Sequence, residues 1–326
     1  MAQKDKKMGF EEFGNLYGSK LQSTQHTYDK NTQQPKNSSD NEENNDFIPI
    51  DKKAVKLLKN DTANFSLSFT RLMSWKIENG TVNKIENSAE EFCKDANKKF
   101  KNIQNSLDLI HSHQKEIINQ LGTFPIEIKA RLTSPFISGL GAGHPNETGM
   151  ILDRNTGCPF IQASSVKGVL RLAYALNFAE ENPSLVKDDV VDDKELEKYF
   201  GFADTKDSKP SIDNKRGQLV VLDAYPSKAP KIKLDIMNPH YNKYYGQENK
   251  LPIETEDPIP IKFIGIENGA EFIFRAFFLP LKGENFDEND KKAIESAFEK
   301  AFSVIGFGGK TAIGYGRFEI ISRRTA

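Results

Sequence analysis

The chain has few cysteines, no long apolar run and almost no net charge. Its two cysteines, Cys93 and Cys158, lie far apart, with no CxxC pair and no nearby histidine, which argues for reduced thiols and against a zinc site. No apolar run approaches the roughly 20 residues of a membrane span, and the first residues lack the apolar core of a signal peptide. The net charge of −1 excludes a strongly basic, free-standing nucleic-acid binder. We expect a cytoplasmic protein with no membrane, metal or cofactor.

Composition divides the 326 residues into three regions. Residues 1–49 include a stretch rich in Gln, Asn, Ser, Asp and Glu, which predicts a disordered tail. Residues 50–122 predict a helical N-terminal region, with helical spacing over 54–75 and one long helix over 88–121. Residues 123–326 predict a further domain, with a polar, acidic insertion over 180–216 that lies outside its core.

The long helix predicted over 88–121 has an apolar stripe at spacings of three and four. Ser88 and Glu91 fit a capping box, Gln114 interrupts the stripe, and Gly122 ends the helix. The stripe is most simply a packing face, and a partner-binding face stays open as the alternative. Its members are Phe92, Ala96, Phe100, Ile103, Leu107, Ile110, Ile117 and Leu121.

From residue 123 onward, the elements follow the order strand, helix, strand, strand, helix, strand. This is the order of the ferredoxin-like, split βαβ fold, which RNA-recognition motifs share, so we predict an α+β class. Two further extended segments are predicted at 231–237 and 259–266. The predicted strands are 125–135, 217–226, 269–280 and 314–322, and the predicted helices are 164–179 and 287–305.

Five of the fourteen residues in IGFGGKTAIGYGRF, 305–318, are glycine. A P-loop is excluded, because Val304 stands where its first glycine belongs and the segment follows a helix instead of opening one. Gly306, Gly308 and Gly309 instead predict outward-facing N–H groups, and Lys310 and Thr311 add a charge and a hydroxyl. Such a loop suits an RNA backbone. The alternative is a tight turn that needs glycine for its geometry alone.

The helix that begins near ASSVKGVLR is a second candidate anion site. Ser164 and Ser165 are natural N-caps, and Lys167 and Arg171 share a face one turn apart near the positive end of the helix. Gly168 between them leaves room for an approaching backbone. The alternative is an amphipathic helix with two solvated cations.

Two other segments carry candidate RNA contacts. His144 lies in a glycine-rich loop near Glu147, where it is either a general base or a hydrogen-bonding or stacking residue. No second histidine, Ser–His–Asp set or metal-ligand spacing accompanies it. Asn238, His240 and Tyr241 lie in an aromatic, amide-rich stretch that suits base stacking, or equally a packed loop at a subunit boundary.

These motifs, in their fixed order, resemble the RAMP superfamily of CRISPR proteins. The resemblance covers roughly 124–322 and is strongest to the sixth subunits of Cmr, or type III-B, effector complexes. It is carried by SGLGAGHPNETG, GCPFIQASSVKGVLR, GQLVVLDAYP, LDIMNPHY and GFGGKTAIGYGRF. Gln162 and Ala163 depart from an expected PG, and GFGGK departs from an expected GIGAK.

The resemblance implies a ferredoxin-like RAMP fold and a non-catalytic scaffold role in antiviral defence. The expected partners are the 3′ part of the CRISPR guide RNA, the target RNA, the repeated backbone subunit, the small helical subunit and a neighbouring RAMP end subunit. Three alternatives stay open: an endoribonuclease with His144 as base, the end subunit of a type III-A complex, and a protein–protein adaptor. The RNA-binding residues it implies are His144, Ser164, Ser165, Lys167, Arg171, Asn238, His240, Tyr241, Gly306, Gly308, Gly309, Lys310, Thr311, Gly314, Tyr315 and Arg317.

Overall fold

The computed structural model of this chain describes residues 46–78, 81–85, 88–144, 148–187, 190–191, 194–202, 215–238 and 260–324. All of these residues belong to one compact unit, Asn44–Ala326. Most of the tail predicted over 1–49 lies outside the described residues, as do Glu147, His240 and Tyr241.

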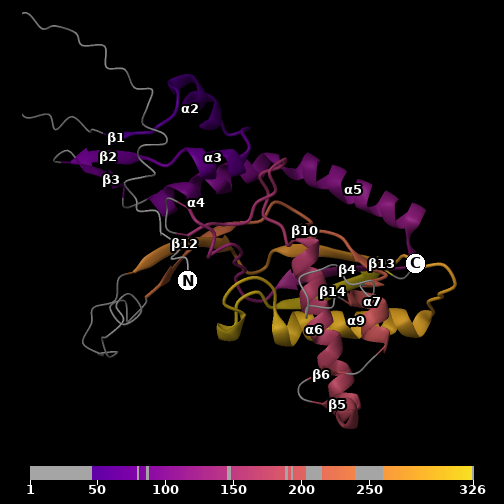
Figure 1. Cartoon of the computed structure of the whole chain (residues 1–326). Coiled ribbons are helices and arrows are strands. Elements are labelled where there is room, and N and C mark those ends of the chain that lie inside the picture. The colour runs from indigo at the N-terminus through magenta and orange to yellow at the C-terminus, as the bar shows by residue number, and fades with distance from the viewer. Residues whose placement is uncertain are drawn as a thin grey trace, which may run out of the picture. The chain divides into compact units, whose positions relative to one another are not determined.

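The central sheet has five antiparallel strands, in the order β10–β13–β4–β14, with β9 also paired to β13 (Figure 1). Strands β13 and β4 pair along most of their length, from Glu271 opposite Arg131 to Phe278 opposite Thr123. The strands are β4 (Thr123–Leu132), β9 (Leu219–Val221), β10 (Tyr225–Pro226), β13 (Glu271–Phe278) and β14 (Phe318–Arg324).

Two helices complete the predicted element order. Helix α6 (Ala163–Glu181) follows β4, and α9 (Glu288–Lys300), extended by a π-helical turn over Ala301–Ile305, precedes β14. Asp287 begins α9 with a capping box. The chain therefore runs β4, α6, β9–β10, β13, α9, β14, which is the predicted β-α-β-β-α-β order. The predicted α+β class is confirmed, and the strands of the central sheet pair antiparallel.

The alternation of side chains along β13 explains why the sheet is covered on both faces. The Phe274 ring lies 4.8 Å from that of Phe302 and 6.2 Å from that of Phe298, so one face packs against α9. The next residue, Arg275, reaches His111 and Gln114 of α5 (Gln104–Leu121) on the other face. Figure 1 shows α5 on one side of the strands and α6 and α9 on the other.

A buried polar network holds α5 on the sheet. The Arg275 guanidinium is fully buried, and it donates from Nε to Glu127 Oε2 at 2.7 Å and from Nη1 to Gln114 Oε1 at 2.6 Å. The same Nη1 lies 2.9 Å from Nδ1 of His111, whose Nε2 lies 3.0 Å from the Pro226 carbonyl oxygen. Arginine only donates, so His111 must be neutral, with its proton on Nε2.

Acidification is expected to weaken this docking. Burial first, and the Arg275 charge next, lower the pKa of His111 below its ordinary value. The unfolded chain therefore binds a proton below about pH 6.5 that the folded chain does not, so stability falls as pH drops through that range and is retained above it. Urea unfolding from pH 8 to 5 should lose stability more steeply in the native chain than in His111→Gln. Equal slopes would contradict the assignment.

The sequence predicts that the N-terminal region over 50–122 is helical, but the structure shows that it also contains strands. It contains a three-stranded antiparallel sheet, β1–β2–β3. The helix predicted over 54–75 is two short helices, because Asn64 accepts from the Ser66 N–H and starts the second one. The elements are β1 (Asp46–Phe47), α2 (Lys52–Leu58), α3 (Phe65–Arg71), β2 (Trp75–Glu78) and β3 (Thr81–Lys84).

The prediction of one continuous helix over 88–121 is wrong. It is divided into α4 (Ser88–Lys99), a 3-10 turn (Phe100–Asn102) and α5. The two helices have different partners: α4 contacts α3 and the ribbon formed by β11 (Ile232–Met237) and β12 (Ile261–Ile266), whereas α5 lies on the central sheet. Because α4 and α5 pack on different partners, the predicted apolar stripe is not buried along its whole length. Ile117 and Leu121 are 40% and 59% exposed, while Gln114 is 8% exposed because it binds Arg275.

The region predicted as an insertion over 180–216 contributes to the core, contrary to prediction. Tyr199 and Phe200 of α7 are buried, and Tyr199 packs edge-on against Tyr174 of α6. The elements of the region are a 3-10 turn (Pro183–Leu185), β5 (Val186–Lys187), β6 (Val190–Val191), α7 (Lys194–Phe200), β7 (Gly201–Phe202) and β8 (Lys215–Arg216).

Candidate nucleic-acid interface

A groove of about 420 Å³ lies between helix α6 and the C-terminal glycine-rich loop, residues 305–318. We call it the α6–loop groove. It brings together motifs that are more than 130 residues apart in the sequence, so two of the predicted anion sites meet in space. Its lining residues are Phe136, Ser138 and Gly139 after β4, Ile151, Phe160–Gln162 before α6, Ser165, Gly168 and Val169 on α6, and Gly308 and Gly309.

The first turn of α6 is capped from outside the helix. Gln162 occupies the N-cap position without a side-chain cap, and the Asp223 carboxylate accepts from the Ala163 N–H at 2.6 Å. The prediction that Ser164 or Ser165 caps the helix is therefore wrong, because the cap comes from a distant segment. Both serines are exposed in the first turn, and neither backbone N–H has a partner among the described residues. These N–H groups and hydroxyls suit an anion.

The strand predicted over 217–226 is interrupted because Asp223, within it, caps the start of α6. Ala224 pairs with Ile161, immediately before α6, and Asp223 is used for the cap. The chain thus forms β9 and β10 as separate short strands, and the segment between them positions the start of α6.

The two cations of α6 differ in their surroundings. Lys167 is half-buried and donates from Nζ to the Leu219 carbonyl at 2.7 Å, which leaves two of its N–H bonds for another acceptor. Burial, and then the nearby charge of Arg216, lower the pKa of Lys167. Arg171 is exposed and forms no ion pair with another described residue. Arg216 is a third cation that sequence reasoning missed, because it lies in a segment that is acidic as a whole.

Three glycines of the C-terminal loop are required by the chain's own packing. A Cβ at Gly316 would lie 1.9 Å from the Phe307 oxygen, and one at Gly308 would lie 2.2 Å from the Ile137 oxygen. A Cβ at Gly306 would lie 2.6 Å from Arg317 Nη1, the end of a flexible side chain, and 3.1 Å from the nearest backbone oxygens, so its positive φ is the stronger requirement for glycine there. All three have positive φ, of 68°, 82° and 79° respectively. At these positions the turn-geometry alternative is correct.

The prediction of outward N–H groups also needs correction. Gly306 N–H donates to the Ala301 carbonyl of the preceding π-helical turn at 2.8 Å, and Gly309 N–H donates at 2.7 Å to the Ile137 carbonyl, in the segment after β4. The N–H groups without a partner among the described residues are those of Gly308, Lys310, Thr311 and Ala312. The concavity is therefore displaced toward the exposed end of the loop.

The residues after the glycines hold the loop in place. Lys310 takes a left-handed conformation with φ 59°, and its Nζ lies 5.9 Å from the centre of the Phe263 ring. Arg317 Nη2 donates to the Thr311 carbonyl at 3.1 Å, and Tyr315 OH donates to Asp235 Oδ2 at 2.9 Å. Gly314 is exposed, with φ 95° and open space around it. Tyr315 and Arg317 thus position the loop, whereas Lys310 and Gly314 lie at its surface.

His144 lies outside the α6–loop groove. Its Nε2 lies 2.8 Å from the Phe69 carbonyl oxygen, and its ring stacks on Phe69 at 4.1 Å with an interplanar angle of 10°. Burial lowers the pKa of His144. Its contacts therefore dock the loop on α3, and one ring face is already covered. Asn238 is exposed at the end of β11.

The comparison with protein families identifies the fold family. The family model of the RAMP superfamily matches residues 129–319, more than half of the chain. The chain belongs to the RAMP superfamily. Membership in this superfamily implies a ferredoxin-like fold, in agreement with the element order. The match spans helix α6 and the whole glycine-rich loop of residues 305–318, so both sides of the groove lie in the part that the family shares.

Similar proteins belong to CRISPR systems. Over 267 residues this RAMP protein is 28% identical to the CRISPR system Cmr subunit Cmr6 of Pyrococcus furiosus, covering 67% of the chain and 75% of that relative. A chain of the type III-B Cmr-beta complex bound to cognate target RNA has a similar fold, with TM-score 0.51, 18% identity and coverage of 74% and 75%. The crystal structure of Cmr6 from Pyrococcus furiosus aligns with TM-score 0.34 and 26% identity over 61% of this chain and 98% of that one.

Within the described part of the chain, no helix has the length and apolarity needed to cross a bilayer. The same residues contain no group of three or more His, Cys, Asp or Glu side chains placed to hold a metal ion.

Proposed function

We propose that this RAMP protein is a non-catalytic RNA-binding subunit of a type III-B CRISPR effector complex, with a role like that of Cmr6. The similarity to Cmr6 and the shared superfamily support the complex. The resemblance of the motifs suggests the 3′ part of the guide RNA as the bound segment and repeated backbone, small helical and neighbouring RAMP subunits as partners. The α6–loop groove and its cationic flank are the RNA-binding surface.

One observation carries the proposal: neither a close contact nor the backbone conformation requires a glycine at position 168. A glycine inside a helix costs about 1 kcal/mol relative to alanine. A Cβ at Gly168 would meet nothing within 4 Å, and φ there is not in the left-handed region. Across the groove, a Cβ at Gly309 would make only ordinary contacts, at 3.6 Å or more. The chain therefore keeps two small residues facing a space that an outside group can fill.

The charges around the groove suit a phosphate backbone. Arg171 is free to pair, Lys167 keeps two donors, and Arg216 lies near Lys167. Phosphate contacts of this kind position a nucleic acid without reading its sequence. A near-neutral net charge is compatible with such a local surface. The packed ring of His144 favours a scaffold over the alternative in which His144 is a general base.

Filling the groove at Gly168 is expected to release RNA without unfolding the protein. Gly168→Leu adds a side chain where the structure leaves open space, so the free energy of unfolding should stay the same or rise by up to about 1 kcal/mol. RNA affinity should fall about tenfold, or about 1.4 kcal/mol. The measurement is the CRISPR guide RNA that copurifies with tagged full-length chain from its native cells.

The matched control is Ser112→Leu, which adds similar bulk to an exposed position of α5 outside the groove. It should retain guide RNA at the native level. Equal retention by both variants would reject the groove as the RNA-binding surface, and absence of RNA from the native preparation would favour the adaptor alternative.

A further inference from the structure

The α6–loop groove contains a hydroxyl group that the folded chain leaves unpaired. Ser138 is 7% exposed, and its Oγ has no hydrogen-bond partner among the described residues. Ser138 follows β4 and lines the groove beside Gly308 and Gly309. Leaving a buried hydroxyl unpaired is unfavourable, so a ligand that supplies the missing partner would gain a hydrogen bond that the protein has already desolvated.

The lining of the groove favours a nucleobase over a phosphate. No charged side chain lines it: its walls are aromatic and aliphatic, with Phe136, Ile151, Phe160 and Val169 among them. An ionised phosphate would lose its hydration there without a counter-ion. Pockets for small ligands are typically apolar, about 300–1,000 Å³ in volume, with a few polar groups that fix orientation, and a groove of about 420 Å³ fits that description.

One wall is a rigid aromatic surface. Phe160 stacks on Tyr225 with ring centres 5.4 Å apart and an interplanar angle of 14°. Tyr225 is buried, and its hydroxyl donates to Asp153 Oδ2 at 2.5 Å. Phe160 itself is only partly buried and lines the groove. Aromatic side chains held in this way stack bases of any identity.

We propose that one base of the bound RNA leaves its stack and enters the α6–loop groove, where Phe160 contacts its face and Ser138 Oγ bonds an atom of its edge. This rests on the proposed RNA-binding function. The cations outside the lining, Lys167 and Arg171, hold the flanking phosphates. Because a serine hydroxyl both donates and accepts, the pocket takes any base and does not read sequence.

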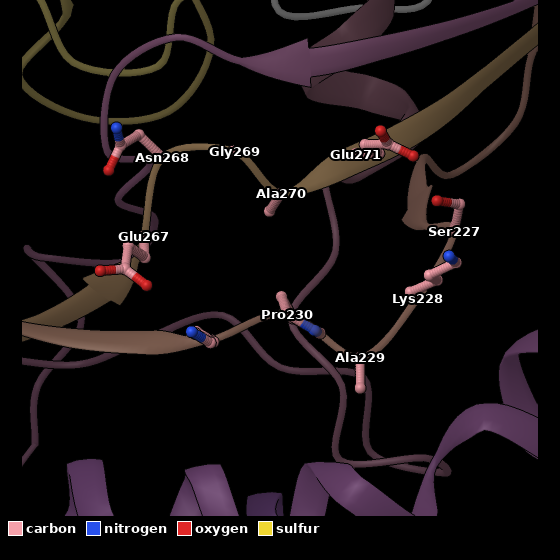
Figure 2. A pocket seen from close by; sticks show the side chains of 10 residues that line it. Ser227, Lys228, Ala229, Pro230, Glu267, Asn268, Gly269, Ala270 and Glu271 are labelled. Carbon is pink, nitrogen blue, oxygen red and sulfur yellow. The ribbon is translucent and has the colours of Figure 1, made fainter.

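A second pocket supplies a matched control. It has a volume of about 380 Å³ and lies between the β10–β11 and β12–β13 connections; Figure 2 shows its lining. Ser227 Oγ, which belongs to this lining, is likewise buried without a partner among the described residues. Charged residues surround this pocket: Lys228, Lys231, Glu267 and Glu271. Ser227→Ala therefore removes the same kind of hydroxyl from a site of different chemistry.

The test is photo-crosslinking in the intact complex. Guide RNAs that each carry one photoreactive uridine are loaded position by position into complexes containing the full chain, and crosslinked peptides are identified by mass spectrometry. One guide position should crosslink to the peptide containing Phe160. Ser138→Ala should lower that yield at least severalfold while leaving the melting temperature unchanged or higher, and Ser227→Ala should leave the yield unchanged.

The outcomes separate this proposal from the one on which it depends. Crosslinks to the peptide containing Arg171 but none to the Phe160 peptide, or equal crosslinks from several successive positions, would overturn the base pocket and leave RNA binding intact. A Ser138→Ala yield equal to the native yield would also overturn it. No crosslink to this chain at any position would overturn both proposals.

Discussion

Gly316→Ala is expected to destabilise the protein severely. The new Cβ would lie 1.9 Å from the Phe307 carbonyl oxygen, and the backbone φ of 68° is unfavourable for any residue with a Cβ. Phe307 is itself fully buried and bonded to Gly316, since its N–H donates to the Gly316 carbonyl at 3.0 Å. The obstacle is backbone, so it cannot swing aside. Strain and overpacking together should lower the free energy of unfolding by more than about 3 kcal/mol.

Thermal unfolding of the two variants Gly316→Ala and Gly168→Ala measures the difference. With an unfolding entropy of about 2.1 cal/mol/K per residue, a loss of 3 kcal/mol in a unit as long as Asn44–Ala326 corresponds to a fall in melting temperature of roughly 5 °C. Gly168→Ala is the control, because a Cβ there meets nothing within 4 Å, and it should melt at the native temperature or slightly above. Similar melting temperatures for both variants would show that the loop does not have the packing described here.

Arg275→Met is expected to detach helix α5 from the sheet. The substitution leaves Glu127 without its cation and leaves His111 Nδ1 and Gln114 Oε1 without their donor. Breaking a buried ion pair by removing one partner typically costs 3–5 kcal/mol, and Glu127 keeps some solvent, so a loss of about 3 kcal/mol is expected. Hydrogen exchange should show faster exchange of α5 amides before the central strands are affected.

Arg131→Met is the matched control on the neighbouring strand. Its guanidinium pairs with Glu271 and Glu319 at the surface and is 45% exposed, so its loss should change stability little. A triple variant, Arg275→Met with Glu127→Met and Gln114→Leu, should recover part of the stability, because the Glu127 carboxylate and Gln114 Oε1 are removed together with their donor, whereas His111 Nδ1 and the Asp223 carbonyl stay unpaired. Unchanged α5 exchange in Arg275→Met would reject the docking role.

The sequence was sufficient for the element order and for the motifs of the groove. Side-chain periodicity is a local property: the alternation in β4 and the three-and-four spacing in α9 reflect burial on one face, so they can be read without knowing the partner. The glycine-rich loop and the ASSVKGVLR helix were likewise identified by composition, and the structure places residues of both on one groove.

Tertiary structure alone decided the features that depend on distant partners. The long helix divides because α4 and α5 pack on different sheets, and Gln114 faces inward because Arg275 is buried opposite it. Asp223 caps α6 from 60 residues away, which no local pattern around the two serines could reveal. The glycines show the limit most clearly. Gly316 and Gly168 are the same residue in the sequence, yet one is required by a carbonyl 1.9 Å from its missing Cβ and the other faces open space.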